Sequence, residues 1–141
     1  MARGEGGAAA TLTLPFARRQ RSRQRVRLDN GEEAGLYLAR GTVLRDGDRL
    51  VSEDGLVVTV RAAPEQVSTV HCAAAEDQAL LCYHLGNRHV EVQIGAGWVR
   101  YLQDAVLDAM VRGLGFEVTA GRHPFEPLPG AYAAHGMTHG H

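Results

Sequence analysis

The spacing of hydrophobic residues changes about halfway along the 141-residue chain. From residue 11 to residue 62 the apolar positions form short runs between turn dipeptides, and none has a helical period. Asn30-Gly31 predicts a β-hairpin, because this dipeptide readily adopts the left-handed backbone of a two-residue turn. We therefore predict a small all-β domain over residues 11–64. Its predicted strands include Arg25–Asp29, Glu32–Ala39, Arg49–Ser52 and Leu56–Arg61.

A different order of elements follows Pro64, which lacks a backbone donor and marks the predicted boundary. Strands are expected at Val67–Cys72, Val90–Ile94, Trp98–Tyr101 and Phe116–Ala120, with a first helix at Glu76–Leu85. A second helix should end at Gly113 and Gly115 and present one apolar face, made of Leu102, Val106, Ala109 and Met110. The order β-α-β-β-α-β is the split βαβ arrangement, an antiparallel sheet with both helices on one face. Its other face needs a cover from another domain or subunit.

The two ends of the chain lack hydrophobic periodicity. Residues 1–10 are rich in Gly and Ala and are expected to be disordered, and residues 124–141 are expected to form a flexible tail. Apolar runs long enough to cross a membrane are missing, and the first residues have no apolar signal-peptide core. The sequence therefore predicts a cytoplasmic α+β protein with two small domains.

Composition removes some classes of function. Hydrophobic residues make up 45% of the chain, charged residues 22%, and the net charge is −1. These values are ordinary for a globular protein and lack the basic excess of a dedicated nucleic-acid binder. The sequence has no recognisable pairing of nucleophile and base, paired carboxylates or phosphate-binding loop, so we do not expect an enzyme.

Histidines supply the most informative chemistry. His135, His139 and His141 lie within the last seven residues. Imidazole binds nickel, copper and zinc well, and a flexible tail can wrap around an ion. A solvated tail is the alternative interpretation. A purification-tag remnant is another, although a tag would normally be an uninterrupted run of histidines.

His89 is a second candidate ligand. It is expected on the strand after Asn87-Arg88, on the face opposite Val90 and Val92. A single histidine on a strand is most often structural or merely exposed, and one ligand holds a divalent ion poorly. A two-fold dimer could place two copies close together and make the residue a ligand. Structural roles are the expectation for the other histidines and for the two cysteines, which lack CxxC spacing: His71, His84, His123, Cys72 and Cys82.

A run of arginines precedes the predicted hairpin. Six lie within ten residues, without a nearby acid: Arg18, Arg19, Arg21, Arg23, Arg25 and Arg27. Guanidinium groups make bidentate contacts with carboxylates and phosphates, so the run could dock an acidic protein or nucleic acid. It could equally be a solvated strand face with local ion pairs to the acids that follow.

Several segments together resemble the UreE family of urease accessory proteins, which are nickel metallochaperones. The resemblance covers about residues 11–141. It rests on Tyr83-His84-Leu85-Gly86-Asn87-Arg88-His89, Gln93-Ile94, Arg100-Tyr101, Asp104, Val106-Leu107-Asp108, Met110, Pro124-Phe125-Glu126-Pro127 and Gly130-Ala131-Tyr132. In the N-terminal half it rests on Arg21-Ser22-Arg23-x-Arg25, Gly41-Thr42-Val43-Leu44-Arg45-Asp46-Gly47-Asp48 and Glu53-Asp54-Gly55.

The resemblance implies a peptide-binding β domain over residues 11–64 and a ferredoxin-like metal-binding domain over residues 65–123. It also implies a homodimer that binds Ni²⁺ at its interface, with His89 from each subunit and tail histidines as ligands; Zn²⁺ or Cu²⁺ could substitute. Apo-urease and the urease accessory GTPase complex are the implied partners. Some members carry further histidines where this chain has Leu102, Gln103 and Ala105, so additional sites there are not expected.

Two other functions remain open on the sequence alone. The arginine-rich β domain could be a docking module for an acidic protein or RNA, with incidental histidines. Alternatively, the chain could buffer zinc or copper without any connection to urease.

Overall fold

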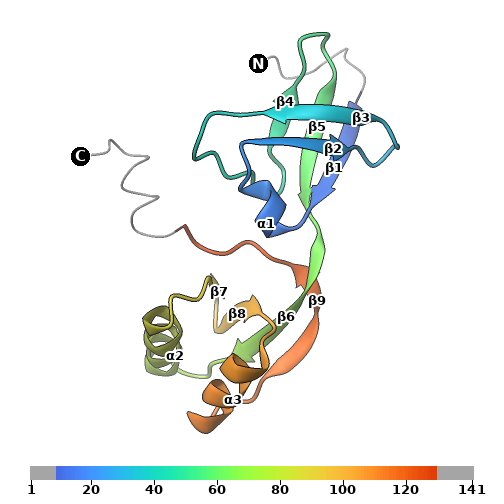
Figure 1. The fold of residues 1–141 in the computed structure, drawn as a ribbon. Helices are drawn as coiled ribbons and strands as arrows, with labels where there is room; N and C mark the ends of the chain where they lie inside the picture. Colours follow the sequence, from blue (N-terminus) through green and yellow to red (C-terminus); the bar gives the residue numbers. More distant parts are fainter. Residues whose placement is uncertain (1–8, 130–141) are drawn as a thin grey trace, which may run out of the picture. The chain divides into compact units, whose positions relative to one another are not determined.

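The computed structural model describes residues 9–129, which form two compact units divided between Ala63 and Pro64 (Figure 1). The predicted boundary followed Pro64, whereas in the structure Pro64 is the first residue of a strand of the second unit. The predicted α+β class is confirmed, because strands predominate and three short helices accompany them. No helix within residues 9–129 is long and apolar enough to cross a membrane.

The N-terminal unit contains two small sheets. One has the strand order β1-β5-β4, with β1 parallel to β5 and β4 antiparallel to it. The other is the antiparallel β2–β3 hairpin. The predicted turn at Asn30-Gly31 is confirmed, and Gly31 has a φ of 98°, which side-chain-bearing residues rarely adopt. The bounds of the five strands are Ala9–Leu14 (β1), Arg23–Arg27 (β2), Glu33–Tyr37 (β3), Arg49–Val51 (β4) and Val57–Ala62 (β5).

Two expectations for this unit are wrong. Ala9 and Ala10 were expected to be disordered, but they pair with Val57 and Val58 as the start of β1. The unit was expected to be all-β, but Phe16–Arg19 forms a short helix, α1. The carbonyl of Pro15 accepts hydrogen bonds from the backbone N–H groups of Arg18 and Arg19. A helix this short has no hydrophobic period, so pattern analysis cannot detect it.

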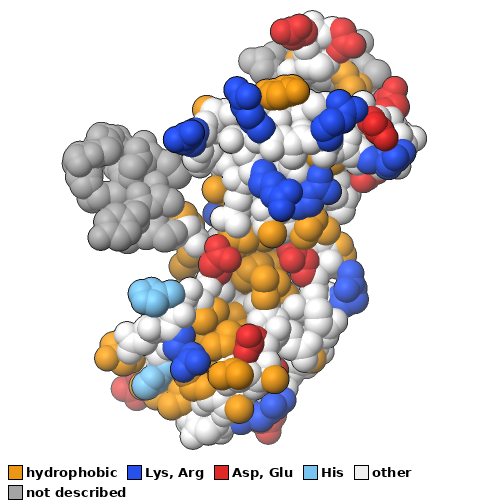
Figure 2. All heavy atoms as spheres, viewed as in Figure 1, with side chains coloured by type: hydrophobic (Ala, Val, Ile, Leu, Met, Phe, Trp, Pro, Cys, Tyr) orange, Lys and Arg blue, Asp and Glu red, His pale blue; other side chains and the backbone are white. Residues whose placement is uncertain are grey.

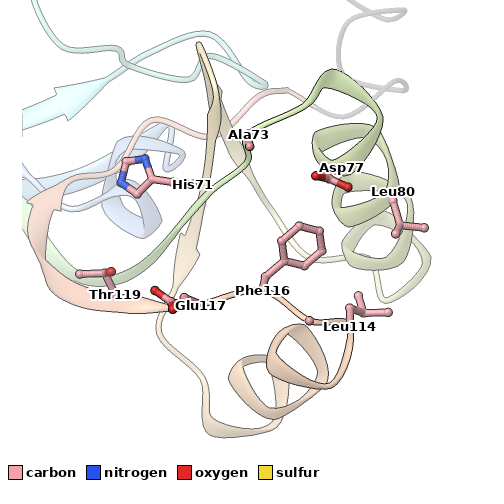
Figure 3. Close-up of a pocket in the computed structure, with 9 residues that line it drawn as sticks. His71, Ala73, Asp77, Leu80, Leu114, Phe116, Glu117 and Thr119 are labelled. Carbon is pink, nitrogen blue, oxygen red and sulfur yellow. The ribbon is translucent and has the colours of Figure 1, made fainter.

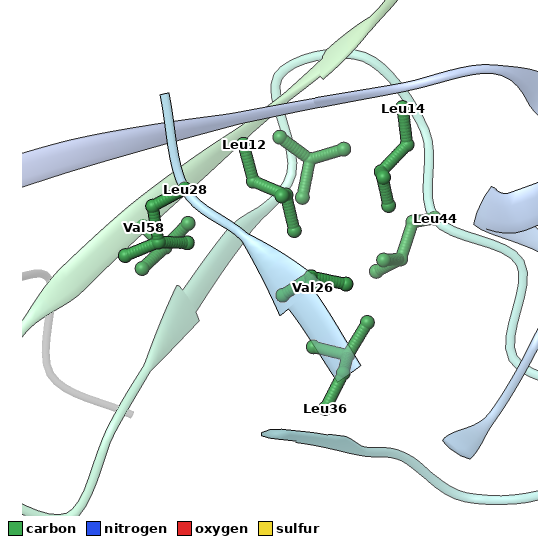
Figure 4. Close-up of a cluster of buried hydrophobic side chains, with 8 residues drawn as sticks. Leu12, Leu14, Val26, Leu28, Leu36, Leu44 and Val58 are labelled. Carbon is green, nitrogen blue, oxygen red and sulfur yellow. The ribbon is translucent and has the colours of Figure 1, made fainter. Parts of the chain in front are cut away.

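The core of the N-terminal unit is made of aliphatic side chains from both sheets and from the segment after β3 (Figure 4). Its buried members are Leu12, Leu14, Val26, Leu28, Leu36, Leu44, Val58 and Val60. Arg19 is also fully buried, and its guanidinium donates hydrogen bonds to the carbonyls of Leu14 and Leu44, at 3.0 and 3.1 Å. This arginine of the run therefore stabilises the fold and is not available to a partner.

The C-terminal unit has the predicted order β-α-β-β-α-β, which is confirmed. Its sheet is antiparallel throughout, with the strand order β7-β8-β6-β9. Leu81 and Leu85 from the first helix and Leu107 and Val111 from the second share one cluster with Val99 of the sheet, so both helices cover the same face. The elements are Pro64–His71 (β6), Ala75–Asn87 (α2), Gln93–Gly95 (β7), Trp98–Leu102 (β8), Ala105–Gly113 (α3) and Thr119–Pro124 (β9).

Asp108 makes the buried face of α3 partly polar. It is 5% exposed, and its Oδ1 accepts hydrogen bonds from the hydroxyls of Ser68 and Tyr101, at 2.7 and 2.6 Å. Burial and the neighbouring carboxylate raise the pKa of Tyr101 well above its usual range, so this phenol stays protonated and donates. Asp104 caps the same helix by accepting from the N–H groups of Val106 and Leu107.

The structure corrects three predictions in the C-terminal unit. On α3, Leu107 and Val111 face the core, whereas Val106 is 62% exposed, so the predicted apolar face is wrong. Residues 90–92 are not in a strand, because β7 begins at Gln93. The last strand begins at Thr119 rather than at Phe116.

The segment after β9 also differs from the predicted flexible tail. Phe125 is fully buried, and the backbone N–H of Glu126 donates to Oε1 of Gln93 at 3.0 Å. The N–H of Leu128 donates to the carbonyl of Val92 at 2.8 Å. Residues 125–128 are therefore held against the β7 side of the unit.

Candidate metal centre

His89 lies just beyond the C-terminal end of α2, after Arg88, whereas it was predicted to lie on a strand. Its N–H donates to the carbonyl of Gly86 at 2.9 Å, and the N–H of Val90 donates to the carbonyl of Leu85 at 3.3 Å. This pair of bonds is a Schellman motif, which satisfies carbonyls left open at a helix end. Val90 packs against the core cluster that contains Leu85, as the hydrophobic contact of this motif requires.

The backbone of His89 is left-handed, with a φ of 57°, the one positive φ among the non-glycine residues in the described part of the chain. Helices usually place glycine at this position, because a side chain there costs about 1 kcal/mol. The imidazole is exposed. An unfavourable backbone conformation costs stability that other interactions must offset, and such positions cluster at functional sites. The exposed imidazole of His89 is therefore a candidate functional group.

The other described histidines do not join His89. His84 is half-buried on α2, where its ring meets that of Tyr83 edge-on with centroids 5.3 Å apart. His71 on β6 and His123 on β9 are exposed. Residues 9–129 contain no group of three or more His, Cys, Asp or Glu side chains that could hold a metal ion. The predicted ligands His135, His139 and His141 lie outside the described residues.

Cys72 is buried and Cys82 is half-buried, and neither belongs to a group of three or more metal-ligating side chains within residues 9–129. Burial, followed by the nearby Asp77 and Cys82, raises the pKa of the Cys72 thiol. Burial also raises the pKa of the Cys82 thiol. Both thiols therefore favour the protonated form, which makes them weak nucleophiles.

A hollow of about 400 Å³ lies at the other end of α2 (Figure 3). It is lined by His71 at the end of β6, Asp77 in the first turn of α2 and the ring of Phe116. Glu117 also lines it, but these side chains do not gather as a set of ligands. The hollow is separated from His89 by the length of the helix, so it is no part of the same site.

Two apolar side chains connected with the His89 turn are exposed: one precedes it on α2, and the other belongs to a residue bonded to the segment after it. Tyr83 on α2 is 64% exposed, and Leu128, which is bonded to Val92, is 53% exposed. Figure 2 shows histidine side chains at the surface over α2, with hydrophobic side chains beside them.

The fold and the site together define a class: a β unit and a split βαβ unit that presents one imidazole beyond a helix end. Comparison with known families gives the same division. The model of the UreE urease accessory protein N-terminal domain matches residues 2–63, and that of the C-terminal domain matches residues 65–141. The chain belongs to the UreE family of urease accessory proteins.

Curated relatives agree over most of the chain. The urease accessory protein UreE of Alkalilimnicola ehrlichii is 60% identical over 125 residues, which cover 89% of this chain and 77% of the relative. The UreE protein of Proteus mirabilis is 57% identical and covers 86% of this chain, with 76% of its own length aligned. That of Vibrio parahaemolyticus is 52% identical over 92% of this chain and 83% of its own length.

Proposed function

We propose that this chain is a cytoplasmic nickel carrier that delivers Ni²⁺ to apo-urease during assembly of the urease active site. The curated relatives are named urease accessory proteins, which supports a role in urease maturation. The proposed partners are apo-urease and the urease accessory GTPase complex. The protein itself catalyses no reaction, and nickel is its cargo.

The exposed His89 imidazole is the observation on which the metal site rests. Among the described residues of one chain, His89 belongs to no group of three or more His, Cys, Asp or Glu side chains that could hold an ion, so these residues of a single protomer do not complete a site. In a two-fold homodimer the same residue of each protomer can lie at the axis, where two imidazoles meet. Burial of Tyr83 and Leu128 in the dimer interface would remove exposed apolar surface close to the same turn.

Histidines of the tail complete the proposed site. His135, His139 and His141 would contribute further imidazoles, which can exchange when a partner protein offers its own ligands. Zn²⁺ and Cu²⁺ can bind the same donors, and Cu²⁺ binds such ligands more strongly than Ni²⁺. Selectivity for nickel therefore depends on geometry, partner contacts and the metal available.

We also propose that the N-terminal unit binds an extended peptide. A hollow of about 560 Å³ is lined by residues of β3 and β4 and by the aliphatic core, including Leu12, Val26 and Val58. Within residues 9–129, β3 pairs only with β2 and β4 only with β5, which leaves an edge of each strand for a further strand.

His89→Gly is the sharpest test of the metal site. Glycine accepts the left-handed backbone, so the variant should fold at least as stably as the wild type while losing the imidazole. Calorimetric titration with Ni²⁺ should show tight binding of one ion per wild-type dimer and an affinity lower by about 100-fold in the variant. His123→Asn, which removes an exposed histidine from β9, is the matched control.

Unchanged tight binding by His89→Gly would refute the interfacial site. Changing His135, His139 and His141 together to Asn, at unaltered chain length, tests the tail separately and should weaken binding less. In cells that lack the gene, nickel-dependent recovery of urease activity by the wild type but not by His89→Gly distinguishes a nickel carrier from a zinc or copper buffer.

A further inference from the structure

The two units of the chain carry opposite charge. Residues 1–63 contain eleven arginines and eight carboxylates, whereas residues 64–141 contain four arginines and eight carboxylates. The overall net charge of −1 therefore conceals a basic N-terminal unit and an acidic C-terminal unit. Figure 2 shows arginines gathered over the β2–β3 hairpin of the N-terminal unit. Clusters of one sign attract partners of the other sign.

Strand alternation puts three of these arginines on one side of β2. Val26 is buried in the core, whereas Arg23, Arg25 and Arg27 are exposed on the opposite face. A fourth guanidinium, that of Arg18, is fixed beside them. Its Nε donates to Oε1 of Gln24 and its Nη2 donates to the carbonyl of Arg25, both at 2.9 Å. We call Arg18, Arg23, Arg25 and Arg27 the arginine face.

The arginine face contains a shallow hollow of about 380 Å³. Arg18, Arg25 and Arg27 line it, together with Val26 and Glu33. Three arginines and one glutamate therefore line the hollow, which has an excess of positive charge. Because the hydrogen bonds of Arg18 hold it in place, less side-chain entropy is lost when an anion binds.

Glu33 indicates which kind of anion suits this hollow. Its two carboxylate oxygens contact Nη2 of Arg25 at 3.3 Å and Nη2 of Arg27 at 3.0 Å. The three side chains are 55–73% exposed, so solvent screens both ion pairs and each is weak. A carboxylate from another molecule could displace Glu33 at little cost.

We propose that the arginine face binds a carboxylate-rich segment of a protein partner. The surface is less suited to single-stranded nucleic acid, because stacking of bases needs a free aromatic ring. Tyr37 is the exposed aromatic residue of the hairpin, but its ring lies over Gly35 and the guanidinium of Arg23 is 5.7 Å from its centroid. The proposal does not involve a histidine and is independent of metal binding.

The test uses the full-length, ¹⁵N-labelled chain and an octaglutamate peptide as the probe. Titration followed by NMR should shift the Nε–H signals of Arg25 and Arg27 and the amide signals of β2 and β3, and the shifts should shrink as salt is raised. Glu33→Gln removes the competing carboxylate and should tighten binding about fivefold. Glu32→Gln makes the same change of charge one residue away, where the carboxylate contacts Asn30, and should alter affinity less than about twofold.

The double variant Arg25→Gln/Arg27→Gln should lower the affinity about tenfold, and Arg40→Gln/Arg61→Gln, equal in charge, should have a much smaller effect. The proposal is wrong if the two glutamate variants behave alike, if both double variants lose the same affinity, or if millimolar octaglutamate causes no salt-sensitive shifts at the hairpin. Tighter binding of an oligothymidylate of equal length would overturn it in favour of nucleic acid. Nickel affinity should be the same in all these variants.

Discussion

The two units stabilise their interiors by different means. The core cluster of the N-terminal unit contains only leucine and valine, and from residue 9 onward the acidic side chains of this unit are exposed. In the C-terminal unit the cluster includes Tyr101, and next to it Asp108 and Ser68 are buried and hydrogen-bonded to each other. The first interior combines aliphatic packing with one buried arginine, Arg19, that donates to backbone carbonyls, whereas the second buries a carboxylate that accepts from side-chain hydroxyls on the sheet.

This difference affects how closely each unit fixes its elements. Aliphatic side chains tolerate small shifts as long as the volume stays filled. The carboxylate of Asp108 must remain within hydrogen-bonding distance of Ser68 on β6 and Tyr101 on β8, which sets the position of α3 on the sheet. A fixed arrangement of helix and sheet suits the unit that presents His89, because the geometry of a metal ligand depends on a rigid support.

The largest expected effect is that of Leu12→Ala in the N-terminal unit. Leu12 is fully buried, and its truncation should lower the free energy of unfolding of this unit by about 3.5 kcal/mol through lost burial and the cavity left behind. Hydrogen exchange of the β1, β2 and β5 amides should report the loss. Trp98, the single tryptophan, lies in the C-terminal unit, so its fluorescence transition should be unchanged. A shift of that transition would contradict the separation of the two interiors.

Asp108→Ala should have an effect of nearly the same size in the other unit. The change leaves the hydroxyls of Ser68 and Tyr101 buried without their acceptor, and the C-terminal unit should lose about 3 kcal/mol of unfolding free energy. Denaturation followed by Trp98 fluorescence measures this loss. Asp108→Asn keeps an acceptor oxygen and should recover part of the stability. If Asp108→Asn and Asp108→Ala cost the same, the hydrogen bonds do not carry the effect.

The same contrast explains how well the sequence predicted the fold. Where local signals are strong, prediction succeeded: the Asn30-Gly31 turn predicted the β2–β3 hairpin, and the apolar run within Leu56–Arg61 predicted the strand that the structure has at Val57–Ala62. On α3 the polar Asp108 occupies a buried position, which disguises the true face. A buried carboxylate can be recognised only when its distant partners, Ser68 and Tyr101, are known.

His89 remains a predicted ligand, and the sequence did not predict the backbone conformation in which the structure places it. His89, Glu91 and Gln93 alternate with apolar residues as in a strand, yet His89 belongs to the helix end. Gly86 and Asn87 just before it are residue types typical of helix ends and could have signalled this. The left-handed backbone results from the carbonyls of the last helical turn and the docking of Val90, which periodicity does not encode.

The smallest expected effect concerns Asp29, which joins the two sheets of the N-terminal unit. Its carboxylate accepts hydrogen bonds from the hydroxyls of Thr11 and Thr13 on β1, at 2.6 and 2.7 Å. These bonds, that of Thr11 first, lower the pKa of Asp29 below its ordinary 3.8. A carboxyl group whose pKa is lower in the folded state stabilises the fold at pH values above its pKa in the unfolded state. This stabilisation is lost as the pH falls through its pKa in the folded state.

Acidification from about pH 5 to below pH 3 should therefore remove the contribution of Asp29 to the free energy of unfolding of the N-terminal unit. This contribution is well under about 1 kcal/mol, because solvent screens the exposed carboxylate. Hydrogen exchange of the β1 and β2 amides across this range measures it. Asp29→Asn should be less stable than the wild type at the upper pH and should lose less stability on acidification, whereas Glu53→Gln controls for net charge. An identical acid dependence in Asp29→Asn would mean that the charge of the Asp29 carboxylate contributes nothing, and that the backbone bond from the Asp29 N–H to the carbonyl of Thr11 and apolar packing hold the two sheets together.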